Sequence, residues 1–353
     1  MTALDDTTLM DRALERAGSV QGLTAPNPWV GCVVSLVDGS IVEGVTHPPG
    51  GPHAEAHALA QLDGRAEGAT LHVILEPCAH HGRTPPCADA IIAAGIERVV
   101  VALEDPDPQV GGRGVAALRA AGVEVEVGVR RAEAADLLRP YLTHRITGRP
   151  HVVLKLAATL DGRTAAPDAT SRWITGPEAR DDVHRLRARS DAILVGAGTV
   201  RADDPALTVR GVDSPLPDTT YDPLRVVLGH IPSDARVQPA LELSGDLGEV
   251  LDELGRRGVL QLLVEGGSGV AGAFHRAGLV DHYTIYLAPA LFGGEDARPL
   301  FRGQGASTIG ELWRGSIADI TRLGEDVRID LQPLGVDPPS EPPPGRIPQE
   351  IQT

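Results

Sequence analysis

Apolar and polar positions alternate along the first half of the chain in a way that predicts strands and helices in turn. Residues 7–17 have an apolar face with helical spacing, formed by Leu9, Met10, Ala13, Leu14 and Ala17. Short apolar runs predict strands at 29–37, 41–45, 70–75, 98–103 and 123–127. The intervening segments predict helices at 53–64, 88–94 and 115–121. This alternation predicts a sheet covered by helices.

A second series of strands and helices begins after residue 150. Strands are predicted at 152–158, 192–195, 225–228, 261–264 and 283–287, and helices at 177–188, 247–257 and 269–277. Two later runs, 316–322 and 326–331, are typical of an antiparallel hairpin. With a linking helix over 130–142, the pattern predicts two domains, 1–148 and 149–335. The proline-rich segment 336–353 is predicted to be disordered.

Composition and charge narrow the class of protein. A length of 353 residues suits two domains. No apolar run reaches the roughly 18 residues of a membrane span, and the acidic N-terminus lacks the features of a secretory signal. We therefore expect a cytoplasmic protein without membrane contact. The net charge of −16 argues against a nucleic-acid partner, because such a surface would repel phosphates.

Three residues with metal-ligating side chains provide the strongest chemical signal. His53, Cys78 and Cys87 offer one imidazole and two thiolates, a set that suits Zn²⁺ and leaves its fourth position open for water. Zinc lowers the pKa of a bound water towards about 7. Glu55, at the predicted start of a helix, can reach this water and carry a proton to leaving ammonia. His-x-Glu followed by Pro-Cys and a second cysteine is the signature of zinc deaminases.

Two other interpretations of this cluster stay open at the level of the sequence. A closed structural zinc site would use His80 or His81 as the fourth ligand. Alternatively, Cys78 and Cys87 would be inert thiols in the core. Three cysteines in a reducing compartment do not suggest disulfide bonds. Cys32 lies among apolar neighbours in a predicted strand, and we interpret it as a small buried residue.

The motifs around these residues resemble a specific family. Ala-Pro-Asn-Pro-Trp-Val-Gly at 25–31, His-Ala-Glu at 53–55, and the segment 76–87 resemble the deaminase half of the bifunctional riboflavin-biosynthesis deaminase/reductase. The eight residues between Cys78 and Cys87, including Gly-Arg-Thr-Pro-Pro, distinguish this family from cytidine and tRNA adenosine deaminases. The resemblance implies a cytidine-deaminase-like three-layer α/β/α domain.

The same resemblance implies which residues bind the substrate in the first domain, namely Asn27, His47, His80 and Arg83. Asn27 would contact the ring. Arg83 would bind the ribose 5′-phosphate, since a guanidinium group matches a phosphate in geometry and charge. Without the motif, Asn27 is equally well explained as a turn residue and Arg83 as a solvated loop charge.

Segments after residue 150 resemble the reductase half of this family, in the expected order: 153–164, 171–176, 186–196, 198–210 and 263–272. They imply a dihydrofolate-reductase-like α/β domain that uses NADPH. The implied cofactor-binding residues are Ala158, Trp173, Thr199, Asp203, Gly267, Ser268, Gly269, Val270, Ala271, Gly272 and Ala273. The implied substrate-binding residues are Ser171, Arg187, Leu207, Arg210 and Glu265.

Two features of this second domain indicate a chemical role in addition to the resemblance. The glycine-rich turn 265–269 lies between a predicted strand and a predicted helix, where a phosphate can approach a helix N-terminus. It is not the Gly-x-Gly-x-x-Gly of a dinucleotide fold. Lys155 is the only lysine among 32 basic residues, and arginine cannot replace a compact amine. We predict that Lys155 polarises the opened sugar during hydride transfer, and Schiff-base chemistry is also open to it.

Simpler structural roles are also open to three of the residues named for the second domain. Lys155 could be a surface residue, Arg187 a charge on an exposed helix face, and Trp173 part of the core. The sequence also departs from the family at one place, where Gly229-His230 replaces an Asp-Ser pair. The segment 231–258 after it contains one predicted helix and no predicted strand. The departure falls on the part expected to hold the adenosine side of NADPH.

The complete prediction is a bifunctional enzyme. It would deaminate 2,5-diamino-6-ribosylamino-4(3H)-pyrimidinone 5′-phosphate and then reduce the ribosyl group with NADPH, giving 5-amino-6-ribitylaminouracil 5′-phosphate. The alternative is a deaminase whose C-terminal domain is a non-catalytic binding or oligomerisation scaffold. A nucleic-acid deaminase and a zinc-stabilised interaction protein are more distant alternatives. We also expect a homo-oligomer whose partner is a small phosphorylated pyrimidine.

Overall fold

The computed structural model of the protein describes residues 4–79, 85–107, 110–168 and 170–335. Its chain separates into two compact units. Among the described residues, the first unit contains those up to Gly148 together with Ser214–Thr220, and the second contains Arg149–Asp213 and the residues from Tyr221 to Gly335. Every helix of the described ranges is too short or too polar to span a lipid bilayer.

A five-stranded sheet forms the centre of the first unit, in the order β2-β1-β3-β4-β5. Its strands are β1 (Gly31–Ser35), β2 (Ile41–Val45), β3 (Thr70–Leu75), β4 (Arg98–Leu103) and β5 (Glu124–Val127). β1 pairs antiparallel with β2 and β3, whereas β3, β4 and β5 are parallel. β3 and β4 are buried almost throughout, as expected for parallel strands covered on both faces.

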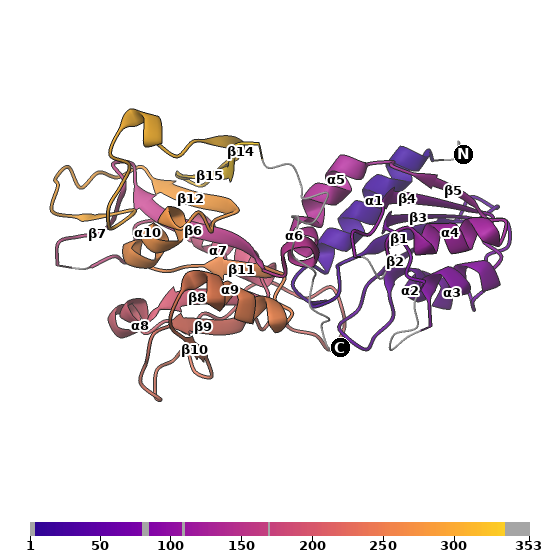
Figure 1. The fold of residues 1–353 in the computed structure, drawn as a ribbon, viewed down its shortest axis with the longest axis horizontal. Coiled ribbons are helices and arrows are strands. Elements are labelled where there is room, and N and C mark those ends of the chain that lie inside the picture. Colours follow the sequence, from indigo (N-terminus) through magenta and orange to yellow (C-terminus); the bar gives the residue numbers. More distant parts are fainter. Residues whose placement is uncertain (1–3, 80–84, 108–109, 169, 336–353) are drawn as a thin grey trace. The chain divides into compact units, whose positions relative to one another are not determined.

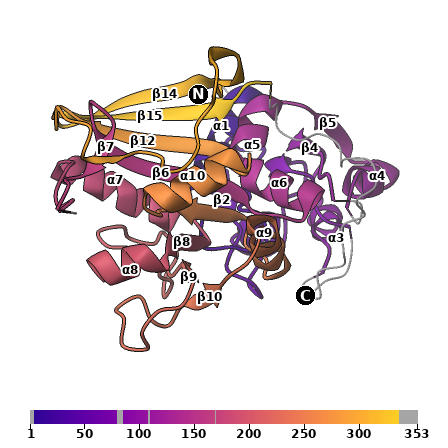
Figure 2. The same ribbon diagram turned by 60° about the vertical axis from the view of Figure 1, so that its left-hand side comes forward.

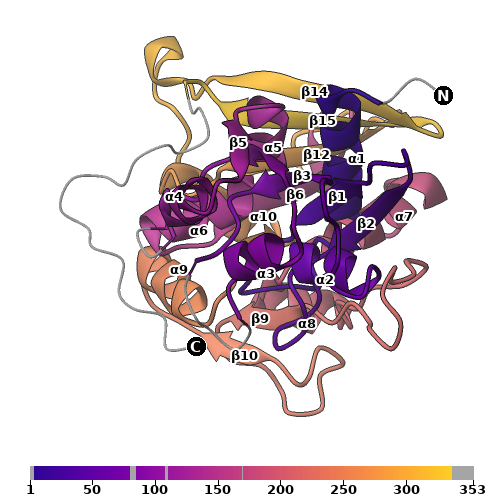
Figure 3. The same ribbon diagram turned by 90° about the vertical axis from the view of Figure 1, so that its right-hand side faces the viewer.

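Helices cover both faces of this sheet: α1 (Asp6–Ser19), α2 (Ala54–Ala60), α3 (Cys87–Ala93), α4 (Arg113–Ala120), α5 (Arg131–Leu137) and α6 (Arg139–Thr147). Figure 1 shows α1 and α5 on one side and α2 and α3 on the other, and Figure 3 shows α2 and α3 adjacent to each other. The three-layer α/β/α prediction is confirmed. The single helix predicted over 130–142 is wrong, because α5 ends at Leu137 and α6 restarts with Pro140 in its first turn.

The start of α2 lies directly against β2 at Gly44. A Cβ atom at this position would lie 2.0 Å from the carbonyl oxygen of Ala54 and 2.8 Å from the nitrogen of Ala58. Only glycine permits this approach, which places His53 and Glu55 relative to the sheet.

Gly44→Ala is therefore expected to destabilise the protein by about 1–3 kcal/mol, the usual cost of overpacking, and to weaken zinc binding. Urea unfolding and zinc content measure the two effects. Gly305→Ala is the control, because a Cβ there would meet no atom within 4 Å. An unfolding midpoint equal to that of the unmodified protein would show that α2 shifts without cost.

An eight-stranded sheet forms the second unit, in the order β10-β9-β8-β11-β6-β12-β15-β14. The strands are β6 (His151–Thr159), β8 (Ala192–Gly196), β9 (Leu224–Leu228), β10 (Leu241–Leu243), β11 (Gln261–Val264), β12 (His282–Ala288), β14 (Gly315–Leu323) and β15 (Asp326–Pro333). In this order, each pair of neighbouring strands from β10 through β9, β8, β11 and β6 to β12 is parallel. The predicted hairpin is confirmed as β14 and β15, which extend the sheet antiparallel beside β12 (Figure 2).

The other elements of this unit are α7 (Pro177–Ala188), α8 (Ala197–Asp203), α9 (Leu247–Arg256), α10 (Ser268–Arg276), the short pair β7 (Arg163–Ala165) and β13 (Arg298–Pro299), and the 3₁₀ turn η1 (Ile309–Glu311). Alternate residues of the strands face two separate cores, so that Leu262 lies in one and Leu263 in the other. The expectation of no strand within 231–258 is wrong. β10 is a half-buried edge strand of three residues that pairs with β9, and so short a run has no visible period.

Candidate active sites

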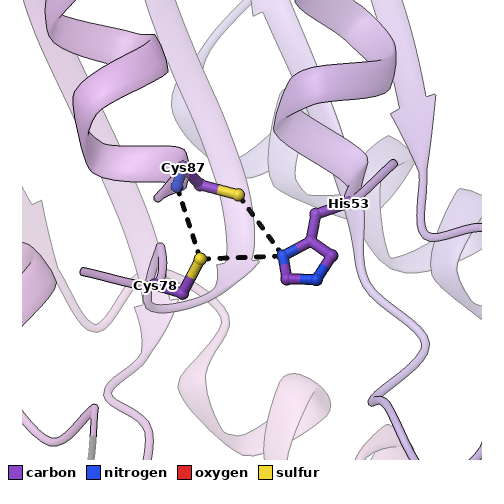
Figure 4. Close-up of side chains that lie close together, drawn as sticks. All are labelled: His53, Cys78 and Cys87. Carbon is purple, nitrogen blue, oxygen red and sulfur yellow. Dashed lines mark hydrogen bonds between the residues drawn. The ribbon is translucent and has the colours of Figure 1, made fainter. Parts of the chain in front are cut away.

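Three metal-ligating side chains meet in the first unit at the starts of two helices (Figure 4). His53 is the N-cap of α2, Cys78 follows β3, and Cys87 is the first residue of α3. Nδ1 of His53 lies 3.7 Å from Sγ of Cys78 and 3.4 Å from Sγ of Cys87. Within the described ranges, this is the cluster of three such ligand atoms that the fold brings together, all within 4.8 Å of one another.

These separations fit a tetrahedral zinc ion. In a tetrahedral site with Zn–S bonds of about 2.3 Å and a Zn–N bond of about 2.0–2.1 Å, the nitrogen and sulfur ligand atoms are about 3.6 Å apart. The sulfur of Cys78 also accepts a hydrogen bond from the backbone nitrogen of Cys87 at 3.3 Å. A hydrogen bond from the Cys87 thiol, and further ones from His53 and the Cys87 backbone, lower the pKa of Cys78, whereas the same contact and burial raise the pKa of Cys87. The short separations among the three ligand atoms favour a metal site over the inert-thiol interpretation.

Glu55 lies in the first turn of α2, buried beside this cluster with 4 % of its surface exposed. Burial raises its pKa to about 7; the charge of Cys78 adds to this rise, and His53 opposes it. A buried carboxyl group beside a metal site is the arrangement needed for proton transfer to a positioned reactant.

The predicted substrate residues of this unit are only partly described. β1 and β2 are paired, and Val30 and Thr46 hydrogen-bond just beyond them, so Asn27 and His47 lie near the same end of the sheet. The backbone of Asn27 also closes a turn with Thr24, as the simpler interpretation expected.

His47 lies beside the zinc cluster, because its backbone nitrogen donates to Pro52, the residue before His53. Its Nε2 is buried and has no hydrogen-bond partner among the described residues. A buried imidazole nitrogen normally has a partner, which a bound ligand can supply. His80, His81 and Arg83 lie outside the described residues. The interpretation of His80 or His81 as a fourth zinc ligand concerns these residues.

Cys32 has the structural role predicted for it. It is fully buried in β1, and its sulfur donates a hydrogen bond to the carbonyl oxygen of Ala54 at 3.1 Å. Burial raises the pKa of this thiol well above its ordinary value, so it stays protonated.

In the second unit, Arg187 and Glu265 form a buried ion pair. Nε and Nη2 of Arg187 lie 2.6 and 2.9 Å from the two carboxylate oxygens of Glu265, and the side chains are 14 % and 8 % exposed. Nη1 of Arg187 donates to the carbonyl oxygen of Thr208. The interpretation of Arg187 as an exposed helix charge is therefore wrong, because the partner that buries it is 78 residues away in the sequence.

Lys155 belongs to the same cluster of charges. It lies half-buried in β6, with β11 on one side and β12 on the other. Burial lowers its pKa, and the nearby carboxylate of Glu265 opposes this while Arg187 adds to it. The alternative of an exposed surface lysine is wrong. His184, three residues before Arg187 on α7, is a further member that sequence reasoning missed. Its pKa is lowered by burial and by the charges of Arg187 and Arg210.

The glycine-rich turn has the predicted position between a strand and a helix. β11 ends at Val264 and α10 begins at Ser268. The backbone nitrogen of Gly267 donates to Oγ1 of Thr199 in α8 at 3.3 Å. A Cβ atom at Gly198 or Gly269 would meet no atom within 4 Å. The open space at the start of α10 suits the phosphates of NADPH, because the N–H groups of a first helical turn lack partners within the helix.

The remaining predicted residues of this unit are placed as follows. Trp173 is 69 % exposed beside Arg180, so its assignment to the core is wrong. The side chain of Leu207 is buried in the core. Nη2 of Arg210 lies 3.3 Å from Nε2 of His184. Ala158 is buried near the end of β6, Ser171 is half-buried, Asp203 ends α8, and Val270, Ala271, Gly272 and Ala273 lie within α10.

Comparisons with known proteins give the same two-part division. Residues 4–103 match the model of the cytidine and deoxycytidylate deaminase zinc-binding region, and residues 150–329 match the RibD C-terminal domain. The riboflavin biosynthesis protein RibD of Escherichia coli K12 is 41% identical over 93% of this chain and 99% of its own length. RibD of Mycobacterium tuberculosis H37Rv is 43% identical over 91% of this chain and 96% of its own length.

Solved structures agree with these relatives. Acinetobacter baumannii RibD is 39% identical, with a TM-score of 0.87 over 93% of this chain and 98% of that one. A diaminohydroxyphosphoribosylaminopyrimidine deaminase/5-amino-6-(5-phosphoribosylamino)uracil reductase from Thermotoga maritima is 34% identical, with a TM-score of 0.82 over 93% of this chain and 98% of that one. This chain therefore belongs to the RibD family of riboflavin biosynthesis proteins, which join a zinc-binding deaminase domain to a reductase domain.

Proposed function

We propose that this chain carries out two consecutive steps of riboflavin biosynthesis. Its first domain, 1–148, deaminates 2,5-diamino-6-ribosylamino-4(3H)-pyrimidinone 5′-phosphate. Its second domain, 149–335, reduces the ribosyl side chain with NADPH to give 5-amino-6-ribitylaminouracil 5′-phosphate. The observation that carries this proposal is the cluster of His53, Cys78 and Cys87 beside the buried carboxyl group of Glu55. The segment 336–353 has no assigned part in either step.

In the deaminase domain, His53, Cys78 and Cys87 would hold Zn²⁺. When bound, zinc activates a water molecule for attack on the ring carbon that bears the amino group. Glu55 takes a proton from the water and delivers it to the leaving ammonia. Asn27 and His47 orient the ring, and this role is supported by Nε2 of His47, which is buried without a hydrogen-bond partner among the residues that the structure describes. His80 also contacts the substrate, and Arg83 binds its phosphate.

In the reductase domain, NADPH supplies the hydride when bound. Its binding residues are Ala158, Trp173, Thr199, Asp203 and the turn formed by Gly267, Ser268, Gly269, Val270, Ala271, Gly272 and Ala273. Lys155 donates a hydrogen bond to the sugar oxygen next to the carbon that is reduced. Its charge is balanced by Glu265, which Arg187 holds through two hydrogen bonds. The substrate is further bound by Ser171, Leu207 and Arg210.

Removal of zinc tests both steps in one preparation. Protein treated with a chelator is expected to release no ammonia from the diaminopyrimidinone phosphate. It is expected to reduce the supplied deaminated intermediate at an unchanged rate, because the zinc ligands lie outside the reductase domain. Mass spectrometry of products with and without NADPH measures each step, and added zinc should restore the first. Ammonia release by metal-free protein would refute the zinc role. If the protein never oxidises NADPH, the alternative of a non-catalytic C-terminal scaffold would be favoured.

We also propose that the protein is a cytoplasmic homo-oligomer. A reducing compartment keeps Cys78 and Cys87 available as zinc ligands. β14 is an edge strand of the large sheet, and its Ile317 and Ile320 are each 59 % exposed. An exposed apolar edge strand offers unpaired backbone groups to a second copy. Sedimentation at several concentrations tests this, and a monomer throughout would refute it.

A further inference from the structure

Glu76, two residues before Cys78, is a buried carboxylate with 4 % of its surface exposed. Its backbone nitrogen donates to the carbonyl oxygen of Leu103 at the end of β4. Its carboxylate accepts three backbone hydrogen bonds from residues that the structure describes. Oε2 accepts from Gly112 at 2.9 Å and from Asp105 at 3.3 Å, and Oε1 accepts from Val115 at 3.0 Å.

These bonds cap a helix from a different part of the fold. The N-cap residue of α4 is Gly112, which has no side chain to satisfy the free N–H groups of the first turn. The carboxylate of Glu76 supplies the missing acceptor, and its negative charge suits the helix N-terminus. The end of β3 is thereby tied both to the start of α4 and to the segment after β4.

The residue between Glu76 and Cys78 is held by close packing against the same helix. A Cβ atom at Gly114 would lie 1.9 Å from the carbonyl oxygen of Pro77, so the backbone of α4 lies directly against Pro77. On the other side, Ala88 donates to the carbonyl oxygen of Cys78 at 3.1 Å. The backbone at Cys78 is therefore fixed by α3 on one side, and by Glu76 with α4 on the other.

We propose that Glu76 is a positioning residue of the zinc site. It touches neither zinc nor substrate and acts through Pro77, setting where the sulfur of Cys78 lies relative to His53 and Cys87. This inference rests on the proposed function, because it assumes that these three residues bind zinc. It gives the glutamate of the Glu-Pro-Cys motif a role distinct from the proton transfer assigned to Glu55.

Glu76→Gln tests this role. A glutamine side chain has one acceptor oxygen and one N–H₂ donor, so at least one of the three N–H groups loses its partner. We expect the zinc dissociation constant to rise about tenfold and the kcat of deamination to fall, as for other outer-shell changes at metal sites. Reduction of the supplied deaminated intermediate should be unchanged. Chelator competition on the full-length protein, well below its unfolding temperature, measures zinc affinity.

Asp6→Asn is the matched control for a general loss of stability. It is also an acid-to-amide change in the first unit, and it weakens a two-point ion pair with Arg98. It is expected to lower the unfolding temperature while leaving zinc affinity unchanged. If Glu76→Gln leaves zinc affinity unchanged, or if Asp6→Asn weakens it equally, the positioning role is wrong.

A second variant covers the case in which Glu76→Gln does not fold. Glu76→Asp keeps the charge but shortens the reach by one methylene group, and it should also weaken zinc binding. Unchanged affinity in this variant would overturn the proposal. Failure of the unmodified protein to bind zinc would refute the proposed function instead, so the two failures are distinguishable.

Discussion

Replacing Glu55 with glutamine is expected to abolish ammonia release while zinc remains bound. Glutamine has nearly the same shape as glutamate, so the buried position in the first turn of α2 is preserved. An amide cannot take up and deliver a proton, and loss of a positioned general acid–base group costs about 10²–10⁴-fold in rate. The ligands His53, Cys78 and Cys87 are unchanged, so zinc affinity should stay close to that of the unmodified protein.

A coupled assay for ammonia and metal analysis of the same sample measure the two quantities. Glu67→Gln is the control, because Glu67 is an exposed residue of the same unit and its variant should deaminate normally. Reduction of the supplied deaminated intermediate should be intact in both variants. Turnover retained by Glu55→Gln would assign the proton transfer to another group.

The second large effect is expected for Lys155→Arg, which should reduce NADPH oxidation by about 10²–10⁴-fold and leave deamination intact. Arginine preserves the positive charge but replaces a compact amine by a wider, planar guanidinium group. Lys155 lies in a half-buried position of β6, near the ion pair of Arg187 and Glu265. A second guanidinium group there would compete for Glu265 and disturb the amine's hydrogen bond to the sugar.

NADPH binding followed by fluorescence separates the two causes of a low rate. The NADPH dissociation constant should change little, because the glycine-rich turn that would hold its phosphates is intact. Arg256→Lys, a change in the reverse direction at a residue with a 59 % exposed side chain, is the control and should behave like the unmodified protein. An unchanged rate of NADPH oxidation in Lys155→Arg would remove Lys155 from the reaction.

The roles assigned to individual residues stay predictions, those of the substrate- and cofactor-binding side chains included. The fold provides positions for them: Gly267 and Thr199 are hydrogen-bonded, and Glu265 and Arg187 are paired. Nε2 of His47 has no hydrogen-bond partner within the part of the chain that the structure describes.

The sequence alone determined the features that depend on local spacing or on the chemistry of a residue type. The apolar face of α1 follows from a period that any helix imposes on burial, and four of its five predicted residues are buried. The cluster of His53, Cys78 and Cys87 was recognisable as a candidate zinc site, because few types of side chain suit this metal. Most of the longer strands of both units were likewise visible, because buried parallel strands such as β3 and β11 are largely apolar. The short elements β7, β10, β13 and α8 were not predicted.

Tertiary structure alone decided the features that depend on partners distant in sequence. β10 is a strand because β9 lies beside it, and Arg187 is buried because Glu265 neutralises it. Among the described residues, the carboxylate of Glu76 has three partners, which lie 29 to 39 residues further along the chain. Such partners come together only when the sheets and helices pack. The spacing of residues along the chain therefore does not predict them.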